Sequence, residues 1–164
     1  MGRRSLIAAR PGFASRAARN NRRIIVFQGT FLLTLDQKGR LSIPSRYREA
    51  FRVVGNSLTI TRHPDGCLVI YPTTVWEEKR EKLKRLPYAA RGFVRFVLGS
   101  AVDVDMDRAG RILIPADLRE LSALTQDVAL VGLGEHFELW NRQTLLVRER
   151  EALENGLDAA DFTF

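Results

Sequence analysis

The chain is 164 residues long, 45% hydrophobic and 27% charged, which is typical of one globular domain or of two small intertwined lobes. No apolar run approaches the ~18 residues of a membrane-spanning helix, so the composition excludes a transmembrane helix. The single cysteine, Cys67, cannot form an internal disulfide, which favours a reducing cytosol.

The positive charge of the chain lies at its N-terminus. The whole chain carries a net charge of +7. Residues 1–25 hold seven arginines and no acidic residue, whereas residues 26–164 hold 19 basic and 19 acidic residues. The basic pI therefore arises from an N-terminal extension, residues 1–25, which we expect to be disordered. The extension is too polar for a secretory signal. It fits a transit peptide, an arm that touches phosphates, or an upstream start with Val26 as the true first residue.

Predicted elements follow from Val26 onward. In the first half, strand patterns cover residues 26–35, 40–43, 57–63 and 67–72, and helix patterns cover 44–51, 75–86 and 88–97. Pro44 fits the first position of its short helix. Thr74 and Glu77 have capping-box spacing, so we expect the next helix to begin there. The helix at 88–97 carries its apolar side chains, including Tyr88 and Phe93, on one side.

The second half repeats this order. Strands are predicted at 101–106, 111–114, 127–133 and 136–140, with helices at 116–121 and 142–155. We expect the last helix to pack through its apolar residues, Leu145, Leu146, Ala152 and Leu153. The residues after it are expected to be loose.

An internal duplication explains the repeated order. "LDQKGRLSIPSRYREA" begins at Leu35, and "MDRAGRILIPADLREL" begins at Met106. Aligned from Asp36 and Asp107, the two stretches agree at 7 of 15 positions, namely Asp, Gly, Arg, Ile, Pro, Arg and Glu. The chain therefore contains two copies of one structural unit.

Each copy contains the turn Asp-x-x-Gly-Arg after its first strand. The Asp carboxylate can accept backbone N–H groups across the turn, and Gly permits the left-handed conformation that ends it. The Arg can pair with the Asp as a staple, although an exposed pair contributes only about 0–1 kcal/mol. Alternatively, the Asp orients the Arg so that its free donors face phosphates or guanine. The residues alone favour the staple slightly.

Other residues yield no catalytic or metal site. His63 and His136 lie in different copies with no Cys or carboxylate at ligand spacing, which argues against zinc. Cys67 opens an apolar strand and is interpreted as a core residue. Tyr47, Trp76 and Trp140 are interpreted as core or interface residues. No phosphate loop or nucleophile elbow occurs, so no cofactor and no small-molecule substrate are expected.

Three stretches together resemble the MraZ family of bacterial transcriptional regulators, which is related to the AbrB and SpoVT swapped-hairpin proteins. They are "FQGTFLLTLDQKGRLSIPSRYREAF", "VLGSAVDVDMDRAGRILIPADLRE" and "LVGLGEHFELWN". The resemblance covers about Val26 to Gln143 and includes both Asp-x-x-x-Arg motifs. Family members usually begin at the position of Val26, which favours the misassigned start.

The resemblance implies an α+β fold, with a β-rich body of two pseudo-symmetric swapped-hairpin halves and peripheral helices. Its repeats would occupy 26–100 and 101–156, between the extension at 1–25 and a flexible tail at 157–164. It also implies a ring-shaped homo-oligomer in the cytoplasm, at the nucleoid. Such a ring would bind double-stranded DNA at short G-rich direct repeats upstream of its own gene, in the cell-division and cell-wall cluster.

The same resemblance assigns residues to DNA binding. Arg40 would be the leading DNA contact, with Lys38 beside it. Arg111 is its counterpart in the second copy. There Arg108 stands in the place of Gln37, and Ala109 replaces Lys38. The turns would be formed and oriented by Asp36, Gly39, Pro44, Asp107, Gly110 and Pro115.

Two further function classes stay open. One is an AbrB-like antitoxin that binds a protein toxin through its C-terminal segment, although only about eight loose residues could wrap a partner. The other is an enzyme, for which no acid–base pair or nucleophile stands out. We therefore expect a regulator that is not an enzyme.

Overall fold

The computed structural model describes residues 26–159 and residue 162. The basic extension at 1–25 lies outside the described residues, as does most of the predicted tail. The strands are β1 (Phe27–Thr34), β2 (Arg40–Ser42), β3 (Ser57–Arg62), β4 (Leu68–Pro72), β5 (Val102–Asp105), β6 (Arg111–Leu113), β7 (Asp127–Gly134) and β8 (Phe137–Asn141). The helices are α1 (Ser45–Arg52), α2 (Thr73–Lys84), the short 3-10 helix η1 (Tyr88–Ala90), α3 (Arg91–Leu98), α4 (Ala116–Leu121) and α5 (Arg142–Asn155). The predicted order of elements is confirmed.

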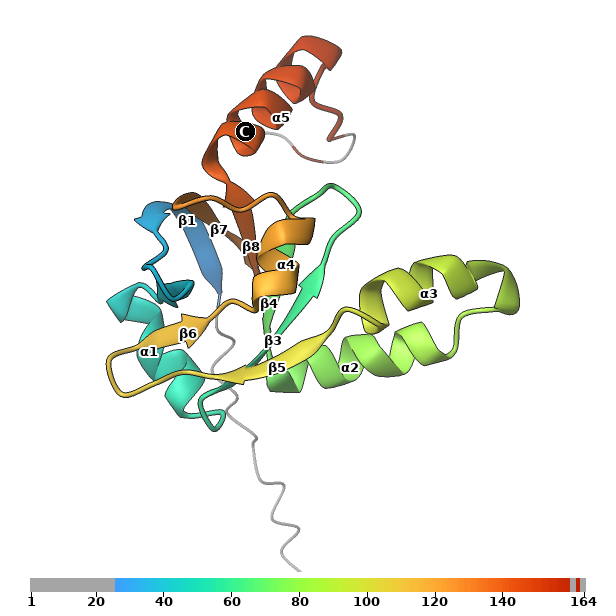
Figure 1. Ribbon diagram of the computed structural model, residues 1–164. Helices are drawn as coiled ribbons and strands as arrows, with labels where there is room; N and C mark the ends of the chain where they lie inside the picture. Colours follow the sequence, from blue (N-terminus) through green and yellow to red (C-terminus); the bar gives the residue numbers. More distant parts are fainter. Residues whose placement is uncertain (1–25, 160–161, 163–164) are drawn as a thin grey trace, which may run out of the picture.

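The two repeats exchange strands. The main sheet has the order β1-β7-β8-β4-β3-β5, and every neighbouring pair in it is antiparallel. The first strand of each repeat therefore pairs with the third strand of the other, β1 with β7 and β5 with β3. A separate ribbon pairs β2 with β6. This palindromic order confirms the predicted α+β fold with pseudo-two-fold, swapped halves (Figure 1).

The core lies between one face of the main sheet and a layer built from the β2–β6 ribbon, α1 and α4. Phe27 of β1, Tyr47 of α1 and Phe137 of β8 meet at its centre, and the ring centroids of Phe27 and Phe137 are 4.3 Å apart. The ribbon contributes Leu41 and Ile112, which are 0% and 1% exposed. Because the ribbon belongs to the core, the turns at its ends are held on a rigid base.

Helices cover the opposite face of the sheet. α2 packs on β3 and β4, α3 packs on β3, and α5 packs on β7 and β8. Because both faces of the sheet are covered, β4 is apolar along its length. Its consecutive residues Val69 and Ile70 point to opposite faces, and both are buried. Cys67, Trp76 and Trp140 are buried here, as predicted.

The helix starts differ from the sequence prediction. α2 begins at Thr73, with Pro72 as its N-cap and no side-chain cap, so the capping box predicted from Thr74 is wrong. β4 continues directly into α2, which leaves Thr74 already inside the first turn. In the second repeat Asn141 stands at this position, and its side chain does accept the N–H groups of Gln143 and Thr144. Pro44 likewise precedes α1 as its N-cap instead of occupying the first helical position.

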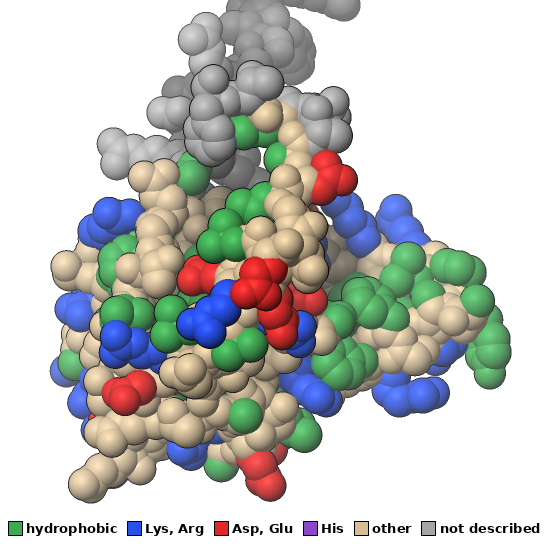
Figure 2. Space-filling view, turned by 90° about the horizontal axis from the view of Figure 1, so that it is seen from above, with side chains coloured by type: hydrophobic (Ala, Val, Ile, Leu, Met, Phe, Trp, Pro, Cys, Tyr) green, Lys and Arg blue, Asp and Glu red, His purple; other side chains and the backbone are tan. Residues whose placement is uncertain are grey.

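Two predicted apolar faces are uncovered in the single chain. α2 and α3 form an arm that projects from the body (Figure 1), and hydrophobic side chains gather along it (Figure 2). Tyr88 is 88% exposed and Phe93 is 47% exposed. On α5, Leu146 and Leu153 are 50% and 69% exposed, so the prediction that the helix packs through them is wrong. Only Leu145 joins the cluster around Trp140.

Candidate nucleic-acid interface

The first turn is closed by Asp36. Its Oδ1 accepts the backbone N–H groups of Lys38, at 3.0 Å, and Arg40, at 2.9 Å. Its Oδ2 accepts the Nε–H of Arg40 at 2.6 Å. The N–H of Gly39 donates to the Asp36 carbonyl at 2.9 Å, and Gly39 has a φ of +82°. The predicted turn is confirmed, and the Asp–Arg pair forms as the staple interpretation requires.

The second turn repeats this geometry. Asp107 accepts from the backbone of Ala109 and Arg111 at 2.9 Å and from the Arg111 Nε–H, also at 2.9 Å. Gly110 has a φ of +79°. In both turns the pKa of the aspartate lies below its ordinary value, chiefly because the backbone N–H of the arginine stabilises the charged carboxylate, with the arginine side chain adding to this.

The two turns are tied to each other across the pseudo-two-fold axis. Arg40 lies opposite Leu113 in the β2–β6 ribbon. Beyond the ribbon, the N–H of Ile43 donates to the Gly110 carbonyl at 2.9 Å, and the N–H of Ile114 donates to the Gly39 carbonyl at 3.0 Å. The two Asp-x-x-Gly-Arg turns are therefore held together as one unit. The sequence predicted each turn but not that β2 pairs with β6.

Two further arginines, which the sequence analysis did not assign, cover the glycines. Arg119 donates its Nε–H to the Ile114 carbonyl at 3.1 Å, and its guanidinium would lie 2.6 Å from a Cβ added at Gly39. Arg48 donates to the Ile43 carbonyl at 2.8 Å and would lie even closer to a Cβ added at Gly110. Each therefore lies on the turn of the other repeat. The signal was present in the sequence, because this Arg is among the seven positions that the copies share.

The predicted DNA-contacting residues are all accessible. The side chains of Arg40 and Arg111 are 31% and 34% exposed, and Lys38 and Arg108 are exposed. Among the described residues, each turn arginine uses only its Nε–H in a side-chain hydrogen bond, so the terminal amino groups keep their donors for a ligand. Pro44 and Pro115 both cap the helices that follow, with φ of −52° and −53°.

The two turns differ in charge. Residues 36–52 hold five basic and two acidic residues, a net charge of +3. The corresponding residues 107–123 hold three of each, a net charge of zero. The backbone geometry is thus shared by both repeats, whereas the positive potential is concentrated on the first.

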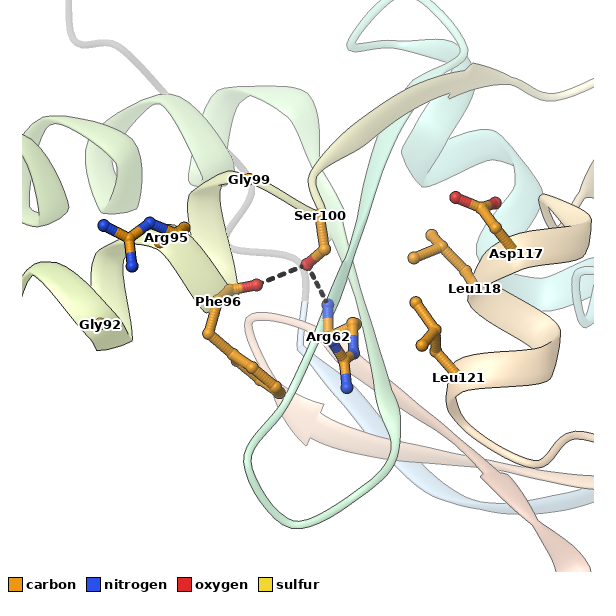
Figure 3. Close-up of a pocket in the computed structure, with 9 residues that line it drawn as sticks. All are labelled: Arg62, Gly92, Arg95, Phe96, Gly99, Ser100, Asp117, Leu118 and Leu121. Atoms are coloured by element: carbon orange, nitrogen blue, oxygen red, sulfur yellow. Dashed lines mark hydrogen bonds between the residues drawn. The ribbon is translucent and has the colours of Figure 1, made fainter.

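A hollow of about 510 Å³ lies between the arm and α4. Figure 3 shows Arg62 between Phe96 of α3 and the leucines of α4, with its guanidinium 4.2 Å from the Phe96 ring centroid. Ser100 fastens α3 to β3 by accepting the Arg62 N–H at 3.2 Å and donating to the Phe96 carbonyl at 2.8 Å. The lining of the hollow combines arginines and apolar groups with Ser100 and Asp117, and among these lining residues no hydrogen bond pairs a nucleophile with a base. None of its residues was assigned a function from the sequence.

The interpretation of His63 needs correction. His63, Cys67 and Glu138 come together on the helix-covered face of the sheet, with one ligand atom from each within 4.8 Å of the others. The prediction that no Cys or carboxylate accompanies His63 is therefore wrong. Glu138 could not be found from the spacing of residues along the sequence, because it belongs to the other repeat. The pairing of β4 with β8 places it beside Cys67.

Within the described ranges, no helix has the length and apolar character that a membrane span requires.

Comparison with known proteins covers nearly the whole described body. Residues 26–95 and 97–161 match the family model "MraZ protein, putative antitoxin-like". A protein of Paraburkholderia xenovorans named "Transcriptional regulator MraZ" is 50% identical over 142 residues, which are 85% of this chain and 100% of that protein. A protein of the same name from Bordetella pertussis is 52% identical over 134 residues, or 80% of this chain and 94% of the relative. One from Burkholderia ambifaria is 48% identical over 142 residues, covering 85% and 100%.

Proposed function

Since the chain belongs to the MraZ family, we propose that it is a transcriptional regulator that binds double-stranded DNA through its paired Asp-x-x-Gly-Arg turns. The names of the relatives support regulation of transcription and give no support to an enzyme. The observation that carries the DNA-binding step is the tethering of Arg40 by its Nε to Asp36, with the terminal amino groups left for a ligand.

Such a tether suits arginine to recognition of DNA. A guanidinium can donate two parallel hydrogen bonds to the O6 and N7 atoms of guanine, or to a phosphate. Asp36 fixes the direction of the side chain before DNA arrives, so less conformational freedom is lost on binding. The staple and the recognition role are therefore compatible, because they use different nitrogens of the same arginine.

The first repeat carries the larger share of the interaction in this proposal. Its turn segment has a net charge of +3, and Lys38 places an ammonium group beside Arg40. Arg111 has the same geometry, but its segment is neutral. We assign base recognition to Arg40 and Arg111, and phosphate contacts to Lys38 and Arg108.

Assembly supplies the remaining affinity. The body at 26–164 is neutral, so one turn pair offers weak attraction to a polyanion. Several copies in a ring, set on direct repeats of matching spacing, raise avidity by ~10²–10⁴. We propose G-rich repeats upstream of the protein's own cell-division and cell-wall gene cluster as the target, and the nucleoid in the cytoplasm as the location.

The test compares two arginines of equal charge. Arg40→Ala should abolish binding to the upstream DNA, while Arg80→Ala, on the exposed side of α2, should leave it unchanged. Footprinting gives the site, and light scattering checks that oligomer size is the same in both variants. Wild-type affinity for the upstream DNA should also fall with salt, by about 0.9 log unit per neutralised phosphate for each tenfold rise. Normal binding by Arg40→Ala would overturn the proposal.

An antitoxin-like role is the second candidate. The description of the family model includes it, and the exposed Leu146 and Leu153 of α5 give it an apolar surface that a protein partner could cover. The two functions separate in the same experiment. An antitoxin that acts only on a protein would bind the upstream sequence no better than a scrambled one.

A further inference from the structure

Three side chains of metal-binding types lie close together where β4 of the first repeat pairs with β8 of the second. They are His63 and Cys67, at the two ends of the β3–β4 turn, and Glu138 on β8. One ligand atom from each lies within 4.8 Å of the other two. Cys67 is 1% exposed, whereas the side chain of His63 is 38% exposed, so the cluster has a closed end and an open end.

Strand pairing forces this meeting. The His63 N–H donates to the Cys67 carbonyl at 2.9 Å, which places the two residues opposite one another as β3 turns into β4. Val69 lies opposite Glu138 in the register of β4 with β8. Because side chains alternate along a strand, Cys67, Val69 and Glu138 share one face of the sheet. The positions are therefore fixed by the central sheet and not by a mobile loop.

These three groups do not bond to each other. Within the described part of the chain, no side-chain hydrogen bond or ion pair joins His63, Cys67 and Glu138. Their other contacts orient them: the indole Nε1–H of Trp140 donates to Glu138 Oε2 at 2.8 Å, and no group among the described residues hydrogen-bonds to Oε1. The Asp65 N–H donates to His63 Nδ1 at 3.2 Å, and the Asp65 carboxylate is 3.5 Å from the same nitrogen.

We propose that His63, Cys67 and Glu138 bind a Zn²⁺ ion that links the β3–β4 turn of the first repeat to β8 of the second. A thiolate, an imidazole and a carboxylate are the ligands that Zn²⁺ uses in proteins, and three of them leave a fourth position for water. Ca²⁺ and Mg²⁺ prefer all-oxygen sites and fit this set poorly. The thiolate and the carboxylate together balance the charge of Zn²⁺, which removes most of the penalty for a charged group beside the core.

Binding is coupled to a proton. Burial and the nearby Glu138 carboxylate raise the pKa of the Cys67 thiol. Zn²⁺ binds the thiolate, and the thiol proton leaves to solvent as the metal–sulfur bond forms. His63, on the open side, provides the entry route. A metal that binds the folded state and bridges two repeats also stabilises that state.

Cobalt gives a direct readout of the site. Full-length protein, freed of metal by a chelator, is titrated with Co²⁺, whose bond to a thiolate produces a charge-transfer band in the near ultraviolet. We expect the band to saturate at one Co²⁺ per chain and to disappear when Zn²⁺ is added. Cys67→Ala should abolish it. His63→Asn and Glu138→Gln should each weaken binding by at least about tenfold, since even partners outside the ligand set typically cost 10–100-fold.

The matched control is Glu135→Gln. Glu135 lies three residues before Glu138 and pairs with Lys79 instead of joining the cluster, so this variant should bind Co²⁺ as the wild type does. Thermal unfolding gives the second readout: at one Zn²⁺ concentration, Tm should rise equally for wild type and Glu135→Gln and by less for His63→Asn, whose side chain is partly exposed. The absence of a charge-transfer band in the wild type, or wild-type affinity in His63→Asn and Glu138→Gln, would overturn the site.

Discussion

The glycine of each Asp-x-x-Gly-Arg turn is required for two reasons: its backbone conformation is left-handed, and an arginine side chain lies against it. Gly39 has a φ of +82°, and a Cβ there would lie 2.6 Å from Cζ and Nε of Arg119. Gly66 has a φ of +99° but open space around it. Both Gly39→Ala and Gly66→Ala should therefore lower the free energy of unfolding, by about 1–2 kcal/mol for the left-handed backbone. Chemical denaturation measures this loss.

Only Gly39→Ala should also change the binding face. The new methyl group pushes Arg119 off its hydrogen bond to the Ile114 carbonyl and so disturbs the tip beside Arg40. A salt-matched titration with the upstream DNA should show weaker binding for Gly39→Ala and unchanged binding for Gly66→Ala. Equal DNA affinities in these two variants would show that the arginine over the glycine has no part in recognition.

The limits of sequence reasoning are clearest at this scale. The Asp36–Arg40 bond was predictable, because both partners belong to one short turn and its spacing restricts the geometry. The position of Arg119 over Gly39 was not, since it depends on contact between residues 80 positions apart in the chain. The same holds for Glu138 beside Cys67, where the register of two strands decides the meeting.

At the scale of elements, α4 offers two leucines with opposite environments. Leu118 is 1% exposed and packs in the core, whereas Leu121, on the same helix, is 55% exposed. Leu118→Ala should lower the free energy of unfolding by about 2–5 kcal/mol, because it removes buried methyl groups and leaves a cavity. Leu121→Ala should change it by no more than about 0.5 kcal/mol. Urea unfolding of the two variants checks the difference, and similar losses would contradict this packing.

Elements were largely predictable, because they depend on local patterns. The last helix was predicted at 142–155 and is found at Arg142–Asn155. What its apolar residues contact was not predictable. Leu153, for example, is 69% exposed. Hydrophobic periodicity shows that a helix face is apolar, but it does not show whether this chain or another one covers that face. The predicted start of α2 was wrong for a local reason: Pro72 already has the backbone angles of an N-cap, so the helix begins at Thr73 and its N-cap lies two residues before Thr74.

The whole molecule depends on exchange between its repeats. β1 finds its partner in β7, β5 finds its partner in β3, and β2 pairs with β6. The repeated sequence indicated two units, but strand patterns alone do not say that the units exchange strands. That part of the fold was accessible only through the family resemblance. Neither repeat completes a sheet from its own strands.

A fragment of residues 26–100 should therefore fail to fold as a monomer. Alone, β1 lacks β7, β3 lacks β5, and the apolar side chains of α1 lose the layer that covers them. A second copy can supply the missing strands, because β7 is the counterpart of β3, so folding should depend on concentration and yield a dimer. Circular dichroism over a dilution series, with light scattering for mass, tests this against residues 26–159 as the control. A fragment that stays folded and monomeric on dilution would mean that β1 can pair within its own repeat, contrary to the exchange.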